Sequence, residues 1–154
     1  MNVLSTENPV FVTYMIAAAI MILKLMGQGW MTVYRMLKIG GGWATPEDLN
    51  PGLINRNPLP EQLELNDYVD RSRRMQRNDL ENIPAFLGCG LLFVAAAPSY
   101  LLANILMYTF VVVRLGHTLA YATKQSHEVR ATLYTIGSLV VIIMALYVLA
   151  VVVF

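Results

Sequence analysis

The chain has 154 residues and a formal charge of +1 at pH 7, and 56% of its residues are hydrophobic whereas only 14% are charged. An ordinary soluble domain carries about 25% charged residues, so the composition argues against a soluble protein and predicts an integral membrane protein. The near-neutral charge gives no indication of a nucleic-acid partner. The single cysteine, Cys89, excludes intramolecular disulfides and argues against a metal cluster, so we expect no metal.

The first apolar run, about 10–36, is long enough to cross a bilayer, which takes roughly 20 helical residues. It has neither a basic n-region nor a clear cleavage site, so we expect no cleavable signal peptide. The following stretch, about 40–66, is polar and contains several prolines, and it predicts a long loop.

Three further helices are expected at about 70–97, 100–123 and 129–154. The apolar part of the second covers only about 80–97, so this helix spans a membrane only if it begins among the arginines near Asp70. The predicted fold is therefore an all-α integral membrane protein with a bundle of four transmembrane helices. A single membrane domain is expected over residues 1–154.

The basic residues predict the orientation of this bundle. None lies at the amino terminus, in the turn Pro98-Ser99 or at the carboxyl terminus. Those in and near the first loop are Lys38, Arg56, Arg71, Arg73, Arg74 and Arg77, and those flanking the third loop are Lys124 and Arg130. By the positive-inside bias, both loops face the cytoplasm and both termini face away from it.

With this topology, four polar stripes fall in the cytoplasmic half of the bilayer, each on one helix face. The stripes consist of Arg35 on the first helix, Arg74, Asn78 and Glu81 on the second, Arg114, His117 and Tyr121 on the third, and Arg130 with Tyr134 on the fourth. Four stripes at one depth indicate a polar cavity, open to the cytoplasm, that binds an anionic ligand among arginines.

Each stripe also has a purely structural interpretation. Arg73, Arg74 and Arg77 are suited to contacting lipid phosphates, and an ion pair with Glu81 would explain Arg114. The same view makes His117 an interhelical hydrogen-bond donor and Tyr121 an interfacial aromatic residue. The sequence assigns no role to Lys24, which lies deep in the first span.

Two motifs carry a resemblance to a known family. Arg74-x-x-Arg77-Asn78-Asp79-Leu80-Glu81-Asn82 and Arg114-x-x-His117-Thr118-x-Ala120-Tyr121 resemble the MAPEG family, the membrane-associated proteins of eicosanoid and glutathione metabolism. The pairs Tyr34-Arg35 and Pro46-Glu47-Asp48, as well as Arg130, match the same family. The resemblance covers nearly the whole chain, and the combination of motifs is specific where each alone is weak.

The resemblance implies a homotrimer with glutathione as cosubstrate, bound between neighbouring subunits near the cytoplasmic face. The implied pocket residues are Arg35, Arg74, Arg77, Asn78, Glu81, His117, Tyr121, Arg130 and Tyr134, with Arg114 supporting the pocket from the helix interior. The arginines would hold the two carboxylates of the tripeptide. The catalytic pair would be Arg130, which stabilises the thiolate, and Tyr134, which donates a second hydrogen bond.

Within the family, the chain resembles the microsomal glutathione transferase branch, with microsomal prostaglandin E synthase as a close relative. Ala131, after Arg130, resembles the transferases, whereas Tyr134 resembles the synthases. The implied activity is conjugation of glutathione to lipophilic electrophiles, with reduction of lipid hydroperoxides as a possible second activity. The alternatives are a glutathione-dependent eicosanoid isomerase and a non-catalytic scaffold that presents lipids. The implied membrane is the endoplasmic reticulum in a eukaryote, or the inner membrane in a bacterium.

Overall fold

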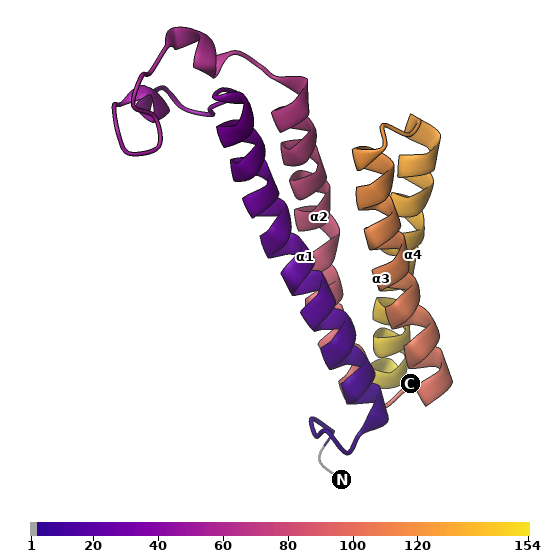
Figure 1. Ribbon diagram of the computed structural model, residues 1–154. Coiled ribbons are helices and arrows are strands. Elements are labelled where there is room, and N and C mark those ends of the chain that lie inside the picture. The colour runs from indigo at the N-terminus through magenta and orange to yellow at the C-terminus, as the bar shows by residue number, and fades with distance from the viewer. Residues whose placement is uncertain (1–2) are drawn as a thin grey trace. The chain divides into compact units, whose positions relative to one another are not determined.

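The computed structural model describes residues 3–154, and within them the chain forms four α-helices, labelled in Figure 1. Their bounds are Pro9–Ile39 for α1, Asp67–Ala95 for α2, Tyr100–Ala122 for α3 and His127–Val153 for α4. Two short 3₁₀ helices, Pro46–Leu49 (η1) and Pro60–Leu63 (η2), lie in the connection between α1 and α2. The all-helical fold predicted from the sequence is confirmed.

Local chemistry explains where the helices begin and end. The Asn8 side chain accepts a hydrogen bond from the backbone N–H of Val10 at 3.1 Å, and Pro9 occupies the first position of α1, where its missing N–H costs nothing. At the other end of α1, Gly40 adopts a φ of +61°, which a glycine tolerates best. Ser99 and Ser126 cap α3 and α4 by accepting hydrogen bonds from Leu102 and Val129.

Three of the four helices found within residues 3–154 are long and apolar enough to cross a membrane: α1, α3 and α4. The helix α2 does begin ahead of the arginines, at Asp67, but its first half is too charged to meet the same criterion. Its role as a fourth span therefore stays a prediction. The three apolar helices support the integral membrane protein that the composition predicts.

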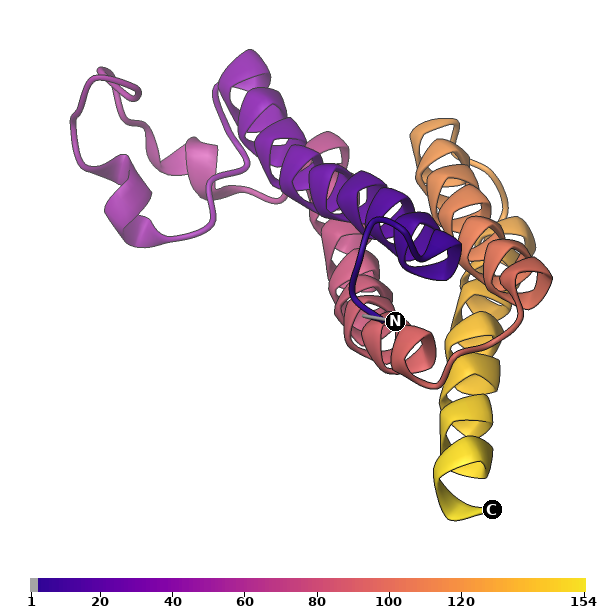
Figure 2. The same cartoon turned by 90° about the horizontal axis from the view of Figure 1, so that it is seen from below.

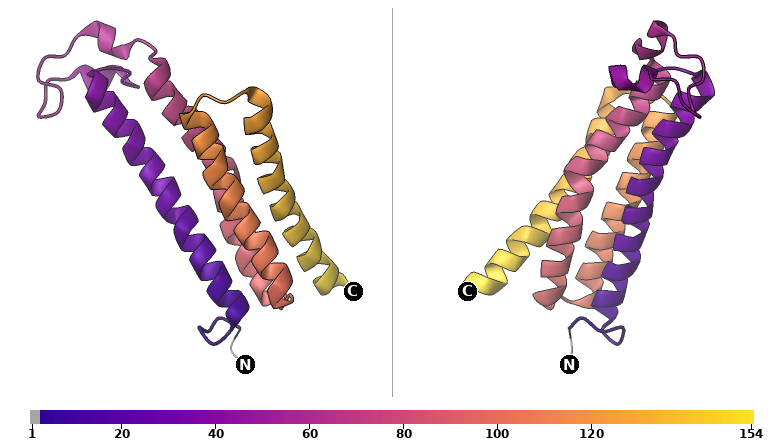
Figure 3. Two further views of the ribbon diagram at one scale, coloured as in Figure 1. Left: turned by 45° about the vertical axis from the view of Figure 1, so that its right-hand side comes forward. Right: turned by 90° about the vertical axis from the view of Figure 1, so that its left-hand side faces the viewer.

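The chain divides into two compact units. The first comprises residues up to Lys24 together with Asp79–Phe154, and it contains α3, α4 and the adjoining halves of α1 and α2. Figure 2 and the right-hand view of Figure 3 show α3 and α4 close together at their connecting turn and separating toward their other ends. Half of the residues in the most apolar stretch of α3 are buried, compared with 17% of those in the corresponding stretch of α4. The helix α3 is therefore the more enclosed of the two.

Aromatic rings pack the interior of this first unit. Phe86 of α2 stacks on Phe110 of α3 with ring centroids 4.1 Å apart, and Phe93 meets Tyr147 of α4 edge-on at 5.1 Å. Such pairs stabilise by about 0.5–1.5 kcal/mol beyond the area that they bury. Because lipid is as apolar as these side chains, packing and hydrogen bonds, rather than exclusion from water, hold helices together in a membrane.

The second unit, Leu25–Asn78, contains the end of α1, the loop with η1 and η2, and the start of α2. Gln28 donates a hydrogen bond to the Ser72 hydroxyl at 2.9 Å, which joins the two helical segments. Arg73 donates to the carbonyl oxygen of Gly42 at 2.5 Å and so ties the loop to α2. The stretch predicted as a long loop is thus partly helical and hydrogen-bonded.

Candidate functional site

A cluster of polar side chains lies on α3 and α4 of the first unit. His117 and Tyr121, one turn apart on α3, are both buried, and their rings meet edge-on with centroids 5.1 Å apart. The guanidinium carbon of Arg130 lies 4.5 Å from the centre of the Tyr121 ring, in a cation–π arrangement. The Nε of Arg130 also donates to the carbonyl oxygen of Ser126 at 3.3 Å, so the side chain is held from two sides.

The helix α2 adds an acidic group to this cluster. The Tyr134 hydroxyl of α4 donates to a carboxylate oxygen of Glu81 at 3.3 Å, and one turn on Ser138 donates to Asn82 at 3.0 Å. The His117 and Tyr134 rings lie 6.5 Å apart. The structure therefore brings together five of the residues predicted from sequence for the site: Glu81, His117, Tyr121, Arg130 and Tyr134.

Arg114 is completely buried, and its partner differs from the one considered from the sequence. Its Nη2 donates to Asp79 at 2.5 Å, so the proposed ion pair with Glu81 is wrong. A step of two residues along an α-helix is a rotation of about 200° about its axis, so the Asp79 and Glu81 side chains point to nearly opposite sides of α2. Asp79 faces the interior of the unit and is 1% exposed, whereas Glu81 is exposed.

Asp79 and Lys24 are two interior charges that the sequence analysis did not assign. The Lys24 ammonium of α1 lies 2.5 Å from the second carboxylate oxygen of Asp79, with 7% of the lysine side chain exposed. A signal for this pairing was present: two cations, Lys24 and Arg114, lie deep in apolar spans, and a buried cation needs an anion. Only the rotation of α2 about its own axis was missing to choose between Asp79 and Glu81.

The remaining predicted residues belong to the second unit. Arg35 donates to the carbonyl oxygen of Tyr68 at 2.9 Å and stacks over the Tyr68 ring at 4.6 Å. Arg74 pairs with two acidic residues of its own helix, with Asp67 at 2.8 Å and with Asp70. Asn78 donates to the carbonyl oxygen of Arg74 at 2.7 Å, and Arg77 is exposed.

Comparison with known proteins identifies the family. The MAPEG family model matches residues 12–150. The chain belongs to the MAPEG family. Microsomal glutathione S-transferase 1 of Bos taurus is 36% identical over 90% of this chain and 88% of its own length, and that of Homo sapiens is 34% identical over the same shares. Prostaglandin E synthase of Homo sapiens is 27% identical over 93% of this chain and 90% of its own length.

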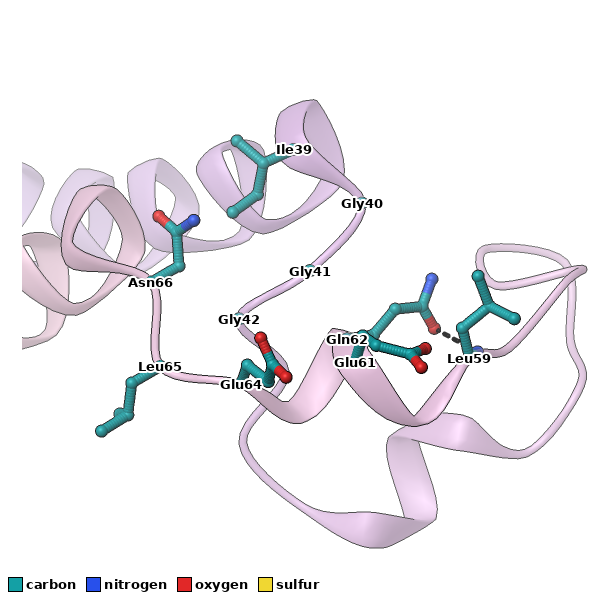
Figure 4. Close-up of a pocket in the computed structure, with 10 residues that line it drawn as sticks. All are labelled: Ile39, Gly40, Gly41, Gly42, Leu59, Glu61, Gln62, Glu64, Leu65 and Asn66. Atoms are coloured by element: carbon teal, nitrogen blue, oxygen red, sulfur yellow. Dashed lines mark hydrogen bonds between the residues drawn. The ribbon is translucent and has the colours of Figure 1, made fainter.

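A hollow of about 320 Å³ in the loop of this MAPEG protein lies apart from the predicted site residues of its unit. Figure 4 shows its lining, in which Gln62 accepts a hydrogen bond from the Leu59 N–H at 3.1 Å. Its charged side chains are Glu61 and Glu64, both acidic. Two carboxylates disfavour an anionic ligand, so we do not assign the hollow to the function.

Across residues 3–154, no group of three or more His, Cys, Asp or Glu side chains is arranged to hold a metal ion.

Proposed function

We propose that this protein is a membrane-bound glutathione transferase that activates the glutathione thiol for attack on lipophilic electrophiles. Family membership supports a glutathione-dependent activity, and the transferase relatives reach 36% identity. The observation that carries the proposal is the position of Arg130. Its Nε and its stacking on Tyr121 hold the side chain, which leaves its terminal N–H groups as donors for a thiolate.

The electrostatic requirement is within the reach of one arginine. A free thiol has a pKa of about 8.5, so only a few per cent is thiolate at pH 7. Lowering that value by about two units takes roughly 2.7 kcal/mol of preferential stabilisation of the thiolate. A charge-assisted hydrogen bond from Arg130 is of this order. Tyr134, whose hydroxyl donates to Glu81 in the structure, is proposed to turn that hydrogen bond to the thiolate when the glutathione amine pairs with Glu81. The thiolate then attacks an electrophile that dissolves in the bilayer.

The remaining roles follow the family pattern. Arg35, Arg74 and Arg77 are proposed to hold the glutathione carboxylates, Glu81 its free amine, and Asn78, His117 and Tyr121 its amides. The ion pairs of Arg74 with its own helix do not prevent this, because exposed pairs of this kind contribute about 0–1 kcal/mol and a ligand carboxylate can replace them. Arg114 is proposed to support the pocket rather than to touch the ligand.

The assembly and location are also proposed from the family pattern. We propose a homotrimer of single-domain protomers, with glutathione between neighbouring copies and both termini away from the cytoplasm. The membrane would be the endoplasmic reticulum or, in a bacterium, the inner membrane. Reduction of lipid hydroperoxides to alcohols and water is proposed as a second activity, in which two glutathione molecules supply the two electrons and leave as glutathione disulfide.

The test is glutathione conjugation to chlorodinitrobenzene by the purified protein in detergent. Arg130→Ala should lower kcat by about 100-fold, as removal of one oxyanion donor does in other enzymes, and leave glutathione binding measurable. Arg56→Ala, which removes an exposed arginine of the loop, is the matched control and should keep the parent rate. A parent protein that neither binds glutathione nor turns over would contradict the proposal and favour a lipid-presenting scaffold.

A glutathione-dependent isomerase is the second candidate, favoured by the likeness to prostaglandin E synthase and by Tyr134. The two reactions place different demands on the site, since an isomerase returns its glutathione and a transferase consumes it. Mass-spectrometric detection of a stable conjugate therefore supports the transferase. Tight glutathione binding with turnover of a lipid endoperoxide, and no conjugate with the electrophile, would establish the isomerase.

A further inference from the structure

Three charged side chains from three helices meet inside the first unit. Lys24 of α1 and Arg114 of α3 each lie 2.5 Å from a different oxygen of Asp79 on α2. Their side chains are 7%, 0% and 1% exposed, in the order Lys24, Arg114 and Asp79. We call these three residues the buried charge triad.

The buried charge triad carries a net positive charge. Two cations share a single carboxylate, so one positive charge is in excess in a region where charge is costly. Asp79 with one of the cations would suffice to join two helices. Within residues 3–154, moreover, Nε and Nη1 of Arg114 are buried and have no hydrogen-bond partner, so Asp79 occupies only part of this guanidinium.

The triad lies next to the polar cluster of α3 and α4. The guanidinium carbon of Arg114 is 6.0 Å from the centre of the Tyr134 ring, and its stem passes Gly137, where an added Cβ would lie 3.4 Å from the arginine Cδ. From Tyr134 and His117 the contacts continue through Tyr121 to Arg130. The titratable and charged groups of this unit that face the cluster are Lys24, Asp79, Glu81, Arg114, His117, Tyr121, Arg130 and Tyr134.

We propose that the excess positive charge of the buried charge triad stabilises the glutathione thiolate from behind His117 and Tyr134. The inference rests on the proposed function, in which Arg130 touches the sulfur. It adds three positioning residues that act on the thiolate through their electric field alone. A unit charge roughly 10 Å away, at an effective dielectric constant of about 20, changes an ionisation equilibrium by about tenfold. Low water access preserves this effect, because mobile ions screen buried charges poorly.

The test is a titration of the thiolate of bound glutathione, followed by its ultraviolet absorbance as the pH is raised. Lys24→Met removes the excess charge, and the thiolate midpoint should rise by about one pH unit. Lys24→Arg retains the charge and should keep the parent midpoint. Lys24→Met combined with Asp79→Asn again leaves one net positive charge, and should bring the midpoint back toward the parent value. Lys38→Met, at the exposed end of α1, controls for loss of a lysine as such.

These variants separate charge from architecture. A purely structural triad predicts that Lys24→Met lowers thermal stability and leaves the midpoint where it was, and that result would overturn the inference. A midpoint raised equally by Lys24→Met and Lys24→Arg would overturn it as well, since the charge is unchanged in the second. Absence of glutathione binding by the parent protein would instead remove the proposed function on which the inference rests.

Discussion

At the scale of single residues, Gly90 of α2 is a position where the packing allows no side chain. A Cβ at this position would lie 2.7 and 2.9 Å from two ring carbons of Tyr14, whose hydroxyl is fixed by a 2.8 Å hydrogen bond to the carbonyl oxygen of Leu87. We predict that Gly90→Ala destabilises the protein by about 1–3 kcal/mol, because a stiff ring on α1 must move. Thermal unfolding in detergent measures this.

Gly88, two residues earlier on the same helix, is the control for Gly90. An added Cβ there would meet nothing within 4 Å. Gly88→Ala should therefore be neutral or stabilise by up to about 1 kcal/mol, as helix propensity predicts. Equal melting temperatures for the two variants would show that the contact with Tyr14 does not limit this position.

The charged residues show how far sequence reasoning reaches at this scale. Spacing along one helix correctly grouped His117 with Tyr121, because residues on one helix face are fixed by geometry. The structural alternative for Arg114, an ion pair with Glu81, named the wrong acidic residue, because the choice between Asp79 and Glu81 depends on how α2 is rotated against α3. That rotation is set by packing between helices, which the hydrophobic pattern of α2 alone does not determine.

At the scale of elements, η1 depends on one carboxylate. Asp48 accepts hydrogen bonds from the backbone N–H groups of Thr45 at 3.1 Å and Ala44 at 3.0 Å, and these bonds hold the pKa of Asp48 below its usual range. A lowered folded-state pKa means that the stabilisation is complete above the ordinary value of about 3.9 and is lost as the pH falls through the folded value. We predict that η1 loosens in this acidic range and is unaffected near neutrality.

The fluorescence of Trp43, next to this turn, can report the change in a Trp30→Phe background. Asp48→Asn should give the acid-form signal already at neutral pH, since an amide accepts these bonds less strongly than a carboxylate. Glu47→Gln, at the exposed neighbour, should titrate like the parent. A Trp43 signal independent of pH in the parent would refute the role given to Asp48.

The element boundaries were predictable to within a few residues for physical reasons. Apolar runs define α1, α3 and α4, and the acidic residues Asp67 and Asp70 in the first turn of α2 mark a helix start that the apolar run alone places too late. The two 3₁₀ helices were not predicted, because each is a single turn begun by a proline, Pro46 or Pro60, and held by local hydrogen bonds. Such turns leave no periodic pattern.

At the scale of the whole molecule, composition was enough to indicate a membrane protein, and the motifs were enough to indicate its family. Side chains exposed along the apolar helices, such as Leu23, Val112 and Val152, fit a lipid environment or contact with further copies. A single chain does not distinguish between these two, because lipid tails and neighbouring helices present the same apolar chemistry. The homotrimer therefore stays a prediction.

The orientation in the membrane is a prediction that depends on basic residues along the whole chain. Every basic residue near the first loop favours its placement on the cytoplasmic side, and no basic residue at the amino terminus opposes it. Single cysteines at Asn57 in the loop and at Glu7 before α1, both exposed positions, can be placed in a Cys89→Ser background. In sealed vesicles of known sidedness, a membrane-impermeant maleimide should label Asn57→Cys only from the cytoplasmic side.

Glu7→Cys should show the opposite labelling, because α1 separates the two positions and is long enough to cross the bilayer. Labelling of both cysteines from one side would mean that α1 does not span, whereas exchange of the two sides would mean that the basic residues do not set the topology. The outcome also bears on the site, since Arg74 and Arg77 follow the same loop along the chain. If the loop faces the cytoplasm, these arginines enter the membrane from the side on which water-soluble glutathione is supplied.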